Sequence, residues 1–170
     1  MNRIILNALM IVLLAAAAVS CGGDKQSKNT AKSESAQSAK KSKDKSDDQV
    51  TLVLKSDDKM KFDKKILSAK PGQKVKLILK HEGKLEKSVM GHNFVLLKQG
   101  TNIRKFSMKA ASAVDNDYIP EGDEVIAHTK MIGGGETTSI TFTAPEAGMY
   151  DYICSFPAHS TLMKGKFVVE

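Results

Sequence analysis

The sequence contains no tryptophan, and aromatic residues make up only 5% of its 170 residues. A nucleic-acid-binding surface needs a basic stripe with interleaved aromatic side chains. The formal net charge is +7, but the positive charges are spread along the chain and form no such stripe. The sequence therefore predicts no nucleic-acid partner.

Cysteine is equally scarce, since only Cys21 and Cys154 are present. One follows an apolar run near the N-terminus, and the other lies at the end of a strand-like segment. Two cysteines with such different surroundings do not make the disulfide framework that stabilises small secreted domains. We expect no disulfide bond between them, and a fold that depends on its apolar core.

The N-terminal apolar run, residues 8–19, is too short to cross a bilayer, which takes about 20 residues in a helix. It follows the positive charge of Arg3, as in a secretory signal peptide, which we assign to residues 1–20. Small residues precede Cys21, as they do in bacterial lipoprotein signals. We expect cleavage before Cys21 and its lipidation, which would anchor the chain to a membrane. Plain secretion with an unmodified Cys21 is the alternative.

The segment that follows is polar, because residues 24–48 contain seven lysines, five acidic residues and six serines, and no aromatic residue. Such a segment cannot bury enough apolar surface to fold. We interpret residues 21–48 as the lipidated cysteine and a disordered tether, and residues 49–170 as the folded domain.

The folded part is a series of short strand-like runs joined by turns, which is typical of a β-sandwich. Residues 74–80 alternate apolar residues with lysines, as in a strand with one buried face. Ile103, Phe106 and Ala110 follow helical spacing, so we expect a short helix within residues 102–114. The expected strands are residues 50–54, 62–68, 74–80, 92–97, 123–127, 137–143, 149–154 and 166–169.

The loop between the last two expected strands carries three soft metal ligands. Four residues separate Cys154 from His159, and three separate His159 from Met163. Two histidines and a cysteine in a plane, with a weak axial methionine, are typical of blue copper electron carriers. His92 is the best candidate for the second histidine. Each residue alone has an ordinary role in a core or on a surface, but their joint spacing, in a loop stiffened by Pro157, favours a metal site.

Residues 154–165 resemble the ligand loop of the azurins, which are cupredoxins, and the similarity extends to residues 90–93, 117–118 and 125–133. The loop spacing is closer to azurins than to plastocyanins or pseudoazurins. The resemblance covers residues 50–170. It implies an all-β, cupredoxin-like Greek-key β-sandwich with one short inserted helix. Azurins usually carry a disulfide bond near their first strands, for which this sequence has no cysteine.

The resemblance also implies how one copper ion would be bound. His92, Cys154 and His159 would form the trigonal plane, with Met163 as a long axial ligand. The carbonyl oxygen of Gly91 would approach from the opposite side, where glycine permits a close approach of the backbone.

Four other residues near these ligands receive roles by the same resemblance. Asn93 and Ser155 would tie the two ligand segments together by hydrogen bonds. His81 is expected to be a partly buried, titrating group near the site, and His128 a surface residue, with no catalytic role for either.

An electron port is implied where the edge of His159 reaches the surface within an apolar patch. A small apolar contact area suits the brief encounters of redox proteins. Scattered apolar side chains without a role are the alternative interpretation. The residues of this expected patch are Met60, Leu85, Val89, Phe156, Pro157, Ala158 and Leu162.

We therefore predict a copper protein that carries single electrons at the bacterial cell envelope, anchored by lipid, with its domain in the periplasm or at the cell surface. Expected partners are transient redox proteins such as a c-type cytochrome or an envelope reductase or peroxidase. An enzyme with a second copper centre is excluded, because two of the four histidines are already assigned. The alternatives are a periplasmic copper-binding or copper-delivery protein and a structural zinc domain.

Overall fold

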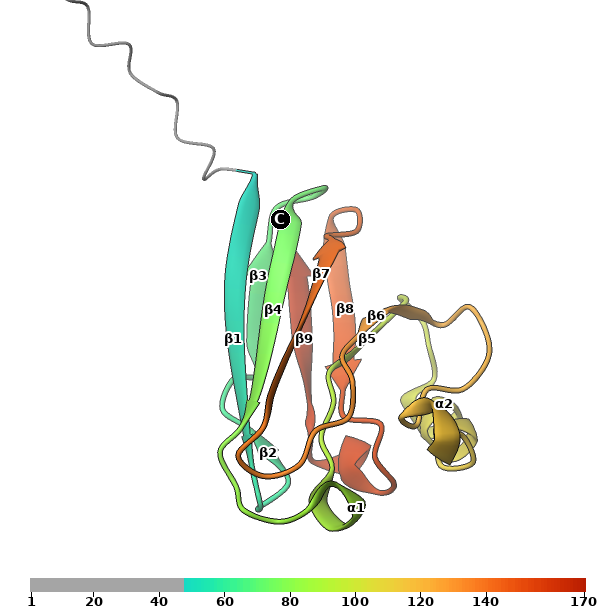
Figure 1. Cartoon of the computed structure of the whole chain (residues 1–170). Helices are drawn as coiled ribbons and strands as arrows, with labels where there is room; N and C mark the ends of the chain where they lie inside the picture. Colours follow the sequence, from blue (N-terminus) through green and yellow to red (C-terminus); the bar gives the residue numbers. More distant parts are fainter. Residues whose placement is uncertain (1–47) are drawn as a thin grey trace, which may run out of the picture. The chain divides into compact units, whose positions relative to one another are not determined.

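The computed structural model describes residues 48–170, which form two β-sheets packed face to face (Figure 1). The predicted signal peptide, the lipidated Cys21 and the predicted tether up to residue 47 lie outside the described residues. Asp48, assigned above to the tether, accepts a hydrogen bond of 2.9 Å from the Lys74 N–H. One sheet has the strand order β2-β1-β4-β7, with the bounds β1 Gln49–Asp57, β2 Lys61–Phe62, β4 Lys74–His81 and β7 Thr137–Thr143. The other has the order β3-β9-β8-β5-β6, with the bounds β3 Ile66–Ala69, β5 Val95–Leu97, β6 Val125–His128, β8 Gly148–Ile153 and β9 Lys164–Val169.

Both sheets are mixed. β1 pairs parallel with β4, and β3 pairs parallel with β9, whereas the other pairs are antiparallel. The predicted all-β sandwich is confirmed. Among residues 48–170, no helix has the length and apolar character needed to cross a membrane.

The alternation of β4 shows how the sequence builds the core between the sheets. Val75, Leu77 and Leu79 are fully buried, while the three lysines of the strand are exposed. Side chains on a strand point alternately to its two faces, so the same alternation carries His81, the last residue of β4, to the inner face. The strand that supplies the centre of the core therefore ends in a buried histidine.

β5 is buried on both faces, because a helix covers the outer side of its sheet. Leu96 belongs to the core between the sheets, whereas Val95 and Leu97 pack in a second cluster with Phe106 and Ala110. These last two residues lie on α2 (Ile103–Ala110), the inserted helix expected within residues 102–114. The Asn102 side chain accepts a hydrogen bond of 3.0 Å from the Lys105 N–H and so caps the helix. A 3₁₀ turn, η1 (Val114–Asn116), follows.

Two expected strands differ from the structure. Residues 62–68 are not one strand, because β2 and β3 belong to different sheets. Asp63 ends β2 by accepting a hydrogen bond of 2.7 Å from the Lys55 N–H. Residues 92–94 precede β5, and His92 forms only an isolated bridge with Ile132. Two short helical turns were not expected, α1 (Lys87–Met90) and η2 (His159–Thr161).

The two ends of the sandwich are different. β1 starts at the end where the C-terminus lies, and the long loops and α1 gather at the opposite end (Figure 1). The register agrees, since Gln49 pairs with Lys74 at the start of β4, whereas His81 ends that strand. The buried histidine therefore lies at the end of the sandwich remote from the start of β1.

Leu77→Ala should lower the free energy of unfolding by roughly 2–5 kcal/mol, because it leaves a cavity between the sheets. The matched control is Ile78→Ala, the next residue of β4, whose side chain is only half-buried on the outer face. Urea denaturation of both variants checks this prediction, and an equal loss in the two would contradict the assignment of the core face.

Candidate metal centre

The cysteine is positioned by the alternation of β8. Tyr150 and Tyr152 point into the core between the sheets, and Cys154 takes the next inward position, just past the end of the strand. Its thiol is free and fully buried. Strand periodicity therefore brings a sulfur atom into the interior at the end of the sandwich where the loops gather.

The histidine and the methionine follow on the turn between β8 and β9. Ala158 adopts a left-handed conformation with φ of 68°, which reverses the chain into η2. The His159 carbonyl accepts a hydrogen bond of 2.8 Å from the Met163 N–H, and the Met163 carbonyl accepts one of 2.9 Å from the Cys154 N–H. All three side chains are buried, so the turn closes over them.

His92 comes from a different part of the chain. Its backbone N–H and carbonyl form two hydrogen bonds of 2.9 Å with Ile132, which fixes the segment before β5. On the imidazole, Nε2 lies 2.9 Å from the Asp57 carbonyl oxygen, the bond expected when Nε2 carries the proton. Nδ1 then keeps its lone pair and faces the Cys154 sulfur at 3.9 Å.

The three ligand atoms converge. The sulfur of Cys154 lies 3.7 Å from His159 Nδ1, and 3.8 Å from the Gly91 carbonyl oxygen. The sulfur and both imidazoles offer ligand atoms that lie within 4.8 Å of one another. An ion bound to sulfur at about 2.3 Å and to nitrogen at about 2.0 Å in a trigonal plane would hold these atoms about 3.7 Å apart. The observed spacing fits one small metal ion.

Burial sets the protonation of the three groups. Desolvation lowers the pKa of both His92 and His159 to about 4, and raises that of the Cys154 thiol to about 12. Both imidazoles are therefore neutral at neutral pH, with lone pairs available for a metal. The thiol keeps its proton until a cation stabilises the thiolate.

A polar clamp joins the two ligand segments. The fully buried Asn93 accepts a hydrogen bond of 2.9 Å from the Ser155 N–H and donates one of 2.8 Å to the Ser155 hydroxyl. Its amide also donates to the Asp117 carbonyl oxygen at 3.1 Å. Asn93 follows His92 and Ser155 follows Cys154, so the clamp holds the two ligand segments in register.

Gly91 brings the backbone close to the site. A methyl group in place of its hydrogen would meet the Lys87 carbonyl oxygen at 2.6 Å and the Met131 side chain at 3.0 Å. No larger residue fits there without movement of α1, which agrees with a carbonyl oxygen held against the sulfur of Cys154.

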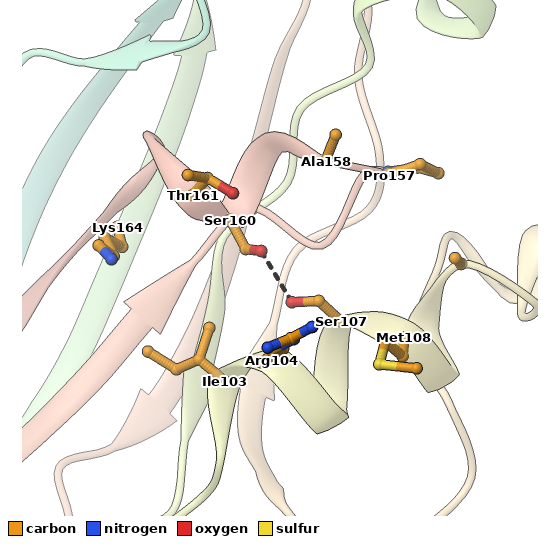
Figure 2. A pocket seen from close by; sticks show the side chains of 10 residues that line it. Ile103, Arg104, Ser107, Met108, Pro157, Ala158, Ser160, Thr161 and Lys164 are labelled. Carbon is orange, nitrogen blue, oxygen red and sulfur yellow. Dashed lines mark hydrogen bonds between the residues drawn. The ribbon is translucent and has the colours of Figure 1, made fainter.

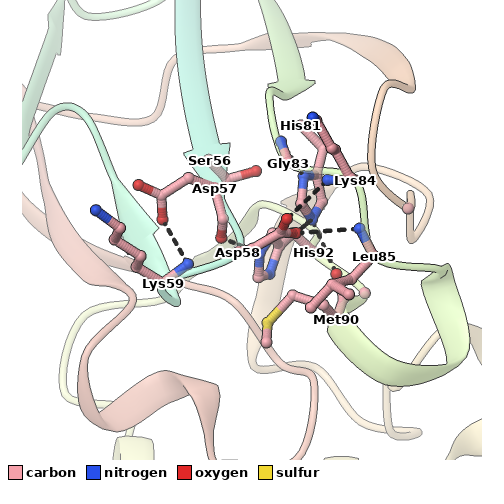
Figure 3. A network of polar contacts seen from close by, with 12 residues as sticks. Ser56, Asp57, Asp58, Lys59, His81, Gly83, Lys84, Leu85, Met90 and His92 are labelled. Atoms are coloured by element: carbon pink, nitrogen blue, oxygen red, sulfur yellow. Dashed lines mark hydrogen bonds and ion pairs between the residues drawn. The ribbon is translucent and has the colours of Figure 1, made fainter.

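His81 lies deeper than expected. Only 2% of it is exposed, and its ring stacks on that of His92 with centroids 4.3 Å apart. Its Nε2 lies 2.9 Å from the Met90 carbonyl oxygen, and its Nδ1 accepts a hydrogen bond of 3.0 Å from the Gly83 N–H (Figure 3). The expected partial burial is wrong, because the alternation of β4 places this ring on the inner face. His128 is exposed, as predicted.

Sequence reasoning missed Asp58. Its carboxylate accepts hydrogen bonds from the Lys84 N–H at 2.7 Å and the Leu85 N–H at 3.3 Å (Figure 3). These bonds hold the pKa of Asp58 below its usual range. They tie the loop before α1 to the turn between β1 and β2. Nothing local in the sequence indicates this pairing, because the partners are 26 and 27 residues apart.

The residues of the expected patch differ in exposure. Leu85, Val89, Ala158 and Leu162 are exposed, whereas Met60, Phe156 and Pro157 are half-buried. His159 is only 3% exposed, and the Phe156 ring lies against it with centroids 4.6 Å apart. Only a small part of the imidazole therefore reaches solvent.

Comparison with known proteins agrees with this geometry. Residues 48–170 match the copper-binding proteins of the plastocyanin/azurin family. Azurin-1 of Alcaligenes xylosoxydans xylosoxydans is 47% identical over 120 residues, or 68% of this chain and 93% of the relative. Azurin of Pseudomonas fluorescens biotype C is 42% identical over 124 residues, or 70% and 97%. The structure of auracyanin A, a blue copper protein of Chloroflexus aurantiacus, is similar with a TM-score of 0.67 and 35% identity, over 72% of this chain and 99% of that one.

The metal-free protein should lose stability as the pH falls from 6.5 to about 4. The folded-state pKa of His92 and of His159 is near 4, whereas the ordinary value is 6.5, so the unfolded chain binds more protons in this window. Thermal melting of chelator-treated protein at several pH values checks this. A His92→Gln/His159→Gln variant should show a flatter profile. A profile equally flat in the unsubstituted protein would contradict the burial of neutral imidazoles.

Proposed function

The chain belongs to the plastocyanin/azurin family of copper-binding proteins, and we propose that His92, Cys154, His159 and Met163 hold its copper ion. It is a type 1 copper protein that binds one copper ion and transfers electrons, and it is not an enzyme. The ligand proposal rests above all on the convergence of three buried ligand atoms within 4.8 Å. Met163, fully buried in the same core cluster as Cys154, supplies the soft thioether, and Gly91 directs its carbonyl oxygen at the sulfur.

Bound copper supplies the chemistry by gaining and losing one electron. The chain prepares for this by holding two neutral imidazoles and one thiol in a site that is almost fully buried. Cys154 would hold the ion as a thiolate, after its proton has passed to solvent. The soft sulfur and the imidazoles together suit both oxidation states.

Fast electron transfer requires that the ligands move little between the two states. Asn93 and Ser155 clamp the segments that carry His92 and Cys154, and the Asp57 carbonyl oxygen orients the His92 ring. Such outer partners fix the direction of metal ligands. These hydrogen bonds therefore keep His92 and Cys154 in fixed positions.

The buried site also argues against metal delivery. A delivery protein must present its ligands to a receiving protein, yet His92 and Cys154 are fully buried and His159 nearly so. Exchange would require opening of the turn that closes over Met163. We therefore retain the electron carrier and not the delivery protein.

We propose that His159 is the port, since it is the ligand on the outer turn, flanked by the exposed Ala158 and Leu162. Partners such as a c-type cytochrome or an envelope reductase or peroxidase would dock there briefly.

We further propose that the chain is anchored at the bacterial cell envelope by lipid on Cys21, with the domain in the periplasm or at the cell surface. The start of β1 lies at the opposite end of the sandwich from α1 (Figure 1), and the proposed ligand His92 contacts Asp57 at the far end of that strand. An anchor attached through residues 21–48 would thus leave the port free to meet partners.

An optical spectrum of the copper-loaded protein tests the ligand set. The wild type should show an intense thiolate-to-copper absorption and a reversible one-electron wave in voltammetry. Cys154→Ser should abolish the absorption, because it removes the thiolate. Met163→Leu should keep the colour and shift the potential, since an axial ligand tunes this property. Met149→Leu, at an exposed position, is the control and should change neither. A Cys154→Ser protein that stays blue would refute the assignment.

Fractionation of a bacterium that processes lipoproteins tests the anchor. The full-length chain should be recovered with membranes. Cys21→Ser should move it to the soluble envelope fraction, because it removes the side chain that carries the acyl chains needed for stable anchoring. Ser27→Ala serves as the control within the same segment. Recovery of the unsubstituted chain in the soluble fraction would contradict the lipid anchor, but it would not bear on the proposed copper ligands.

A further inference from the structure

A groove of about 580 Å³ lies beside the proposed copper site, between α2 and the turn that carries His159 (Figure 2). Ile103 and Met108 of α2 line one wall, and Pro157 and Ala158 line the other. Met108 is 69% exposed, which is unusual for a large apolar side chain. The groove is therefore an open apolar surface directly next to a proposed ligand.

The groove is fixed to the ligand turn. The hydroxyl groups of Ser107 on α2 and Ser160 on η2 form a hydrogen bond of 2.8 Å across it (Figure 2). Ser160 follows His159 in the chain, so the helical wall is held by a side chain adjacent to the proposed ligand. A molecule seated here contacts Ala158 and Ser160, the residues on either side of His159 in the chain.

The charges around the groove are all of one sign. Arg104 and Lys164 line it, and none of its lining residues is acidic. Within residues 48–170, neither cation forms an ion pair. An adjoining hollow shares Ile103 and Lys164 and continues to Ile66, whose side chain is 67% exposed. Its one acidic residue, Asp151, forms an ion pair with Lys166 of the same hollow. The apolar and basic surface is thus larger than the groove itself.

We propose that this groove is a docking site for an acidic redox partner protein, which would place carboxylates on Arg104 and Lys164 and apolar side chains between Met108 and Pro157. This inference rests on the proposed electron-carrier function and names the charge of its partner. Opposite charges at the rim of an interface steer the encounter and raise its rate. The apolar floor then holds the partner beside His159 for a brief contact.

Other occupants fit the charges less well. Residues 24–48 of the chain itself carry more lysines than acidic residues, so they are repelled by the same two cations. A symmetric contact between two copies would place Arg104 and Lys164 of one copy against the same two cations of the other, and these like charges would repel each other. A small ligand needs a cavity that buries most of its surface, whereas six of the ten lining residues are exposed.

The test measures reduction of the copper-loaded protein by two probes, a basic c-type cytochrome and the same cytochrome after succinylation of its lysines. In each reaction the ferrous cytochrome gives up one electron and the cupric protein gains it. Stopped-flow rates are compared at ionic strengths of about 0.01 M and 1 M, where charges are screened beyond roughly 30 and 3 Å. Rates are normalised to the thiolate-to-copper absorption of each sample.

The charge-reversal variant is Arg104→Glu/Lys164→Glu. Its matched control, Lys74→Glu/Lys76→Glu, makes the same change in net charge on exposed residues of β4. With the succinylated probe at low salt, the groove variant should lose about tenfold in rate and the control no more than about twofold. The basic probe should show the opposite sign of effect, and the differences should vanish at high salt.

Equal losses in the two variants would overturn the proposal, because net charge alone would then explain the rates. An NMR titration would also overturn it if decanoate, a small amphiphilic anion, saturated the groove while the acidic cytochrome shifted no groove signal. Sedimentation would overturn it by showing a dimer whose interface is this face. Voltammetry distinguishes a failure of the electron-carrier function from a failure of the docking site. Without a reversible one-electron wave the electron-carrier function fails, whereas a normal wave with no groove effect refutes the docking site alone.

Discussion

The structure depends on the removal of water from one thiol and two imidazoles at the end of a β-sandwich. Burial keeps His92 and His159 neutral and the Cys154 thiol protonated, so none of the three is charged in the metal-free fold. An isolated buried charge would be costly. A cation that enters this site is bound by lone pairs already directed at it, and the protein needs little rearrangement to accept it.

The surroundings of the site explain why these groups stay in place. Asn93 joins the two ligand segments, the Asp57 carbonyl oxygen fixes the His92 ring, and His81 stacks behind that ring. Asp58 adds a second tie between the β1–β2 turn and the loop before α1. The hydrogen bonds of Asn93 and His92 also satisfy polar groups that the fold has buried. Stability and site geometry are therefore produced by the same hydrogen bonds.

The outer turn serves both the interior and the surface. Its inward side chains, Cys154 and Met163, belong to the core, whereas Pro157 and Ala158 line the groove shared with α2. His159 lies between these two environments. The inserted helix covers β5 and also forms one wall of the groove beside the site. One insertion therefore contributes to packing and to the proposed docking surface.

Much of this protein was readable from its sequence, because strand alternation and ligand spacing are local properties. The alternation predicted the sandwich, and the interval from Cys154 to Met163 indicated the metal loop, since a hairpin turn brings near neighbours together. The full burial of His81, the role of Asp58 and the division of residues 62–68 between two sheets were decided only by the tertiary structure. These features depend on contacts between segments far apart in the chain, and such contacts leave no periodic pattern in the residues that make them.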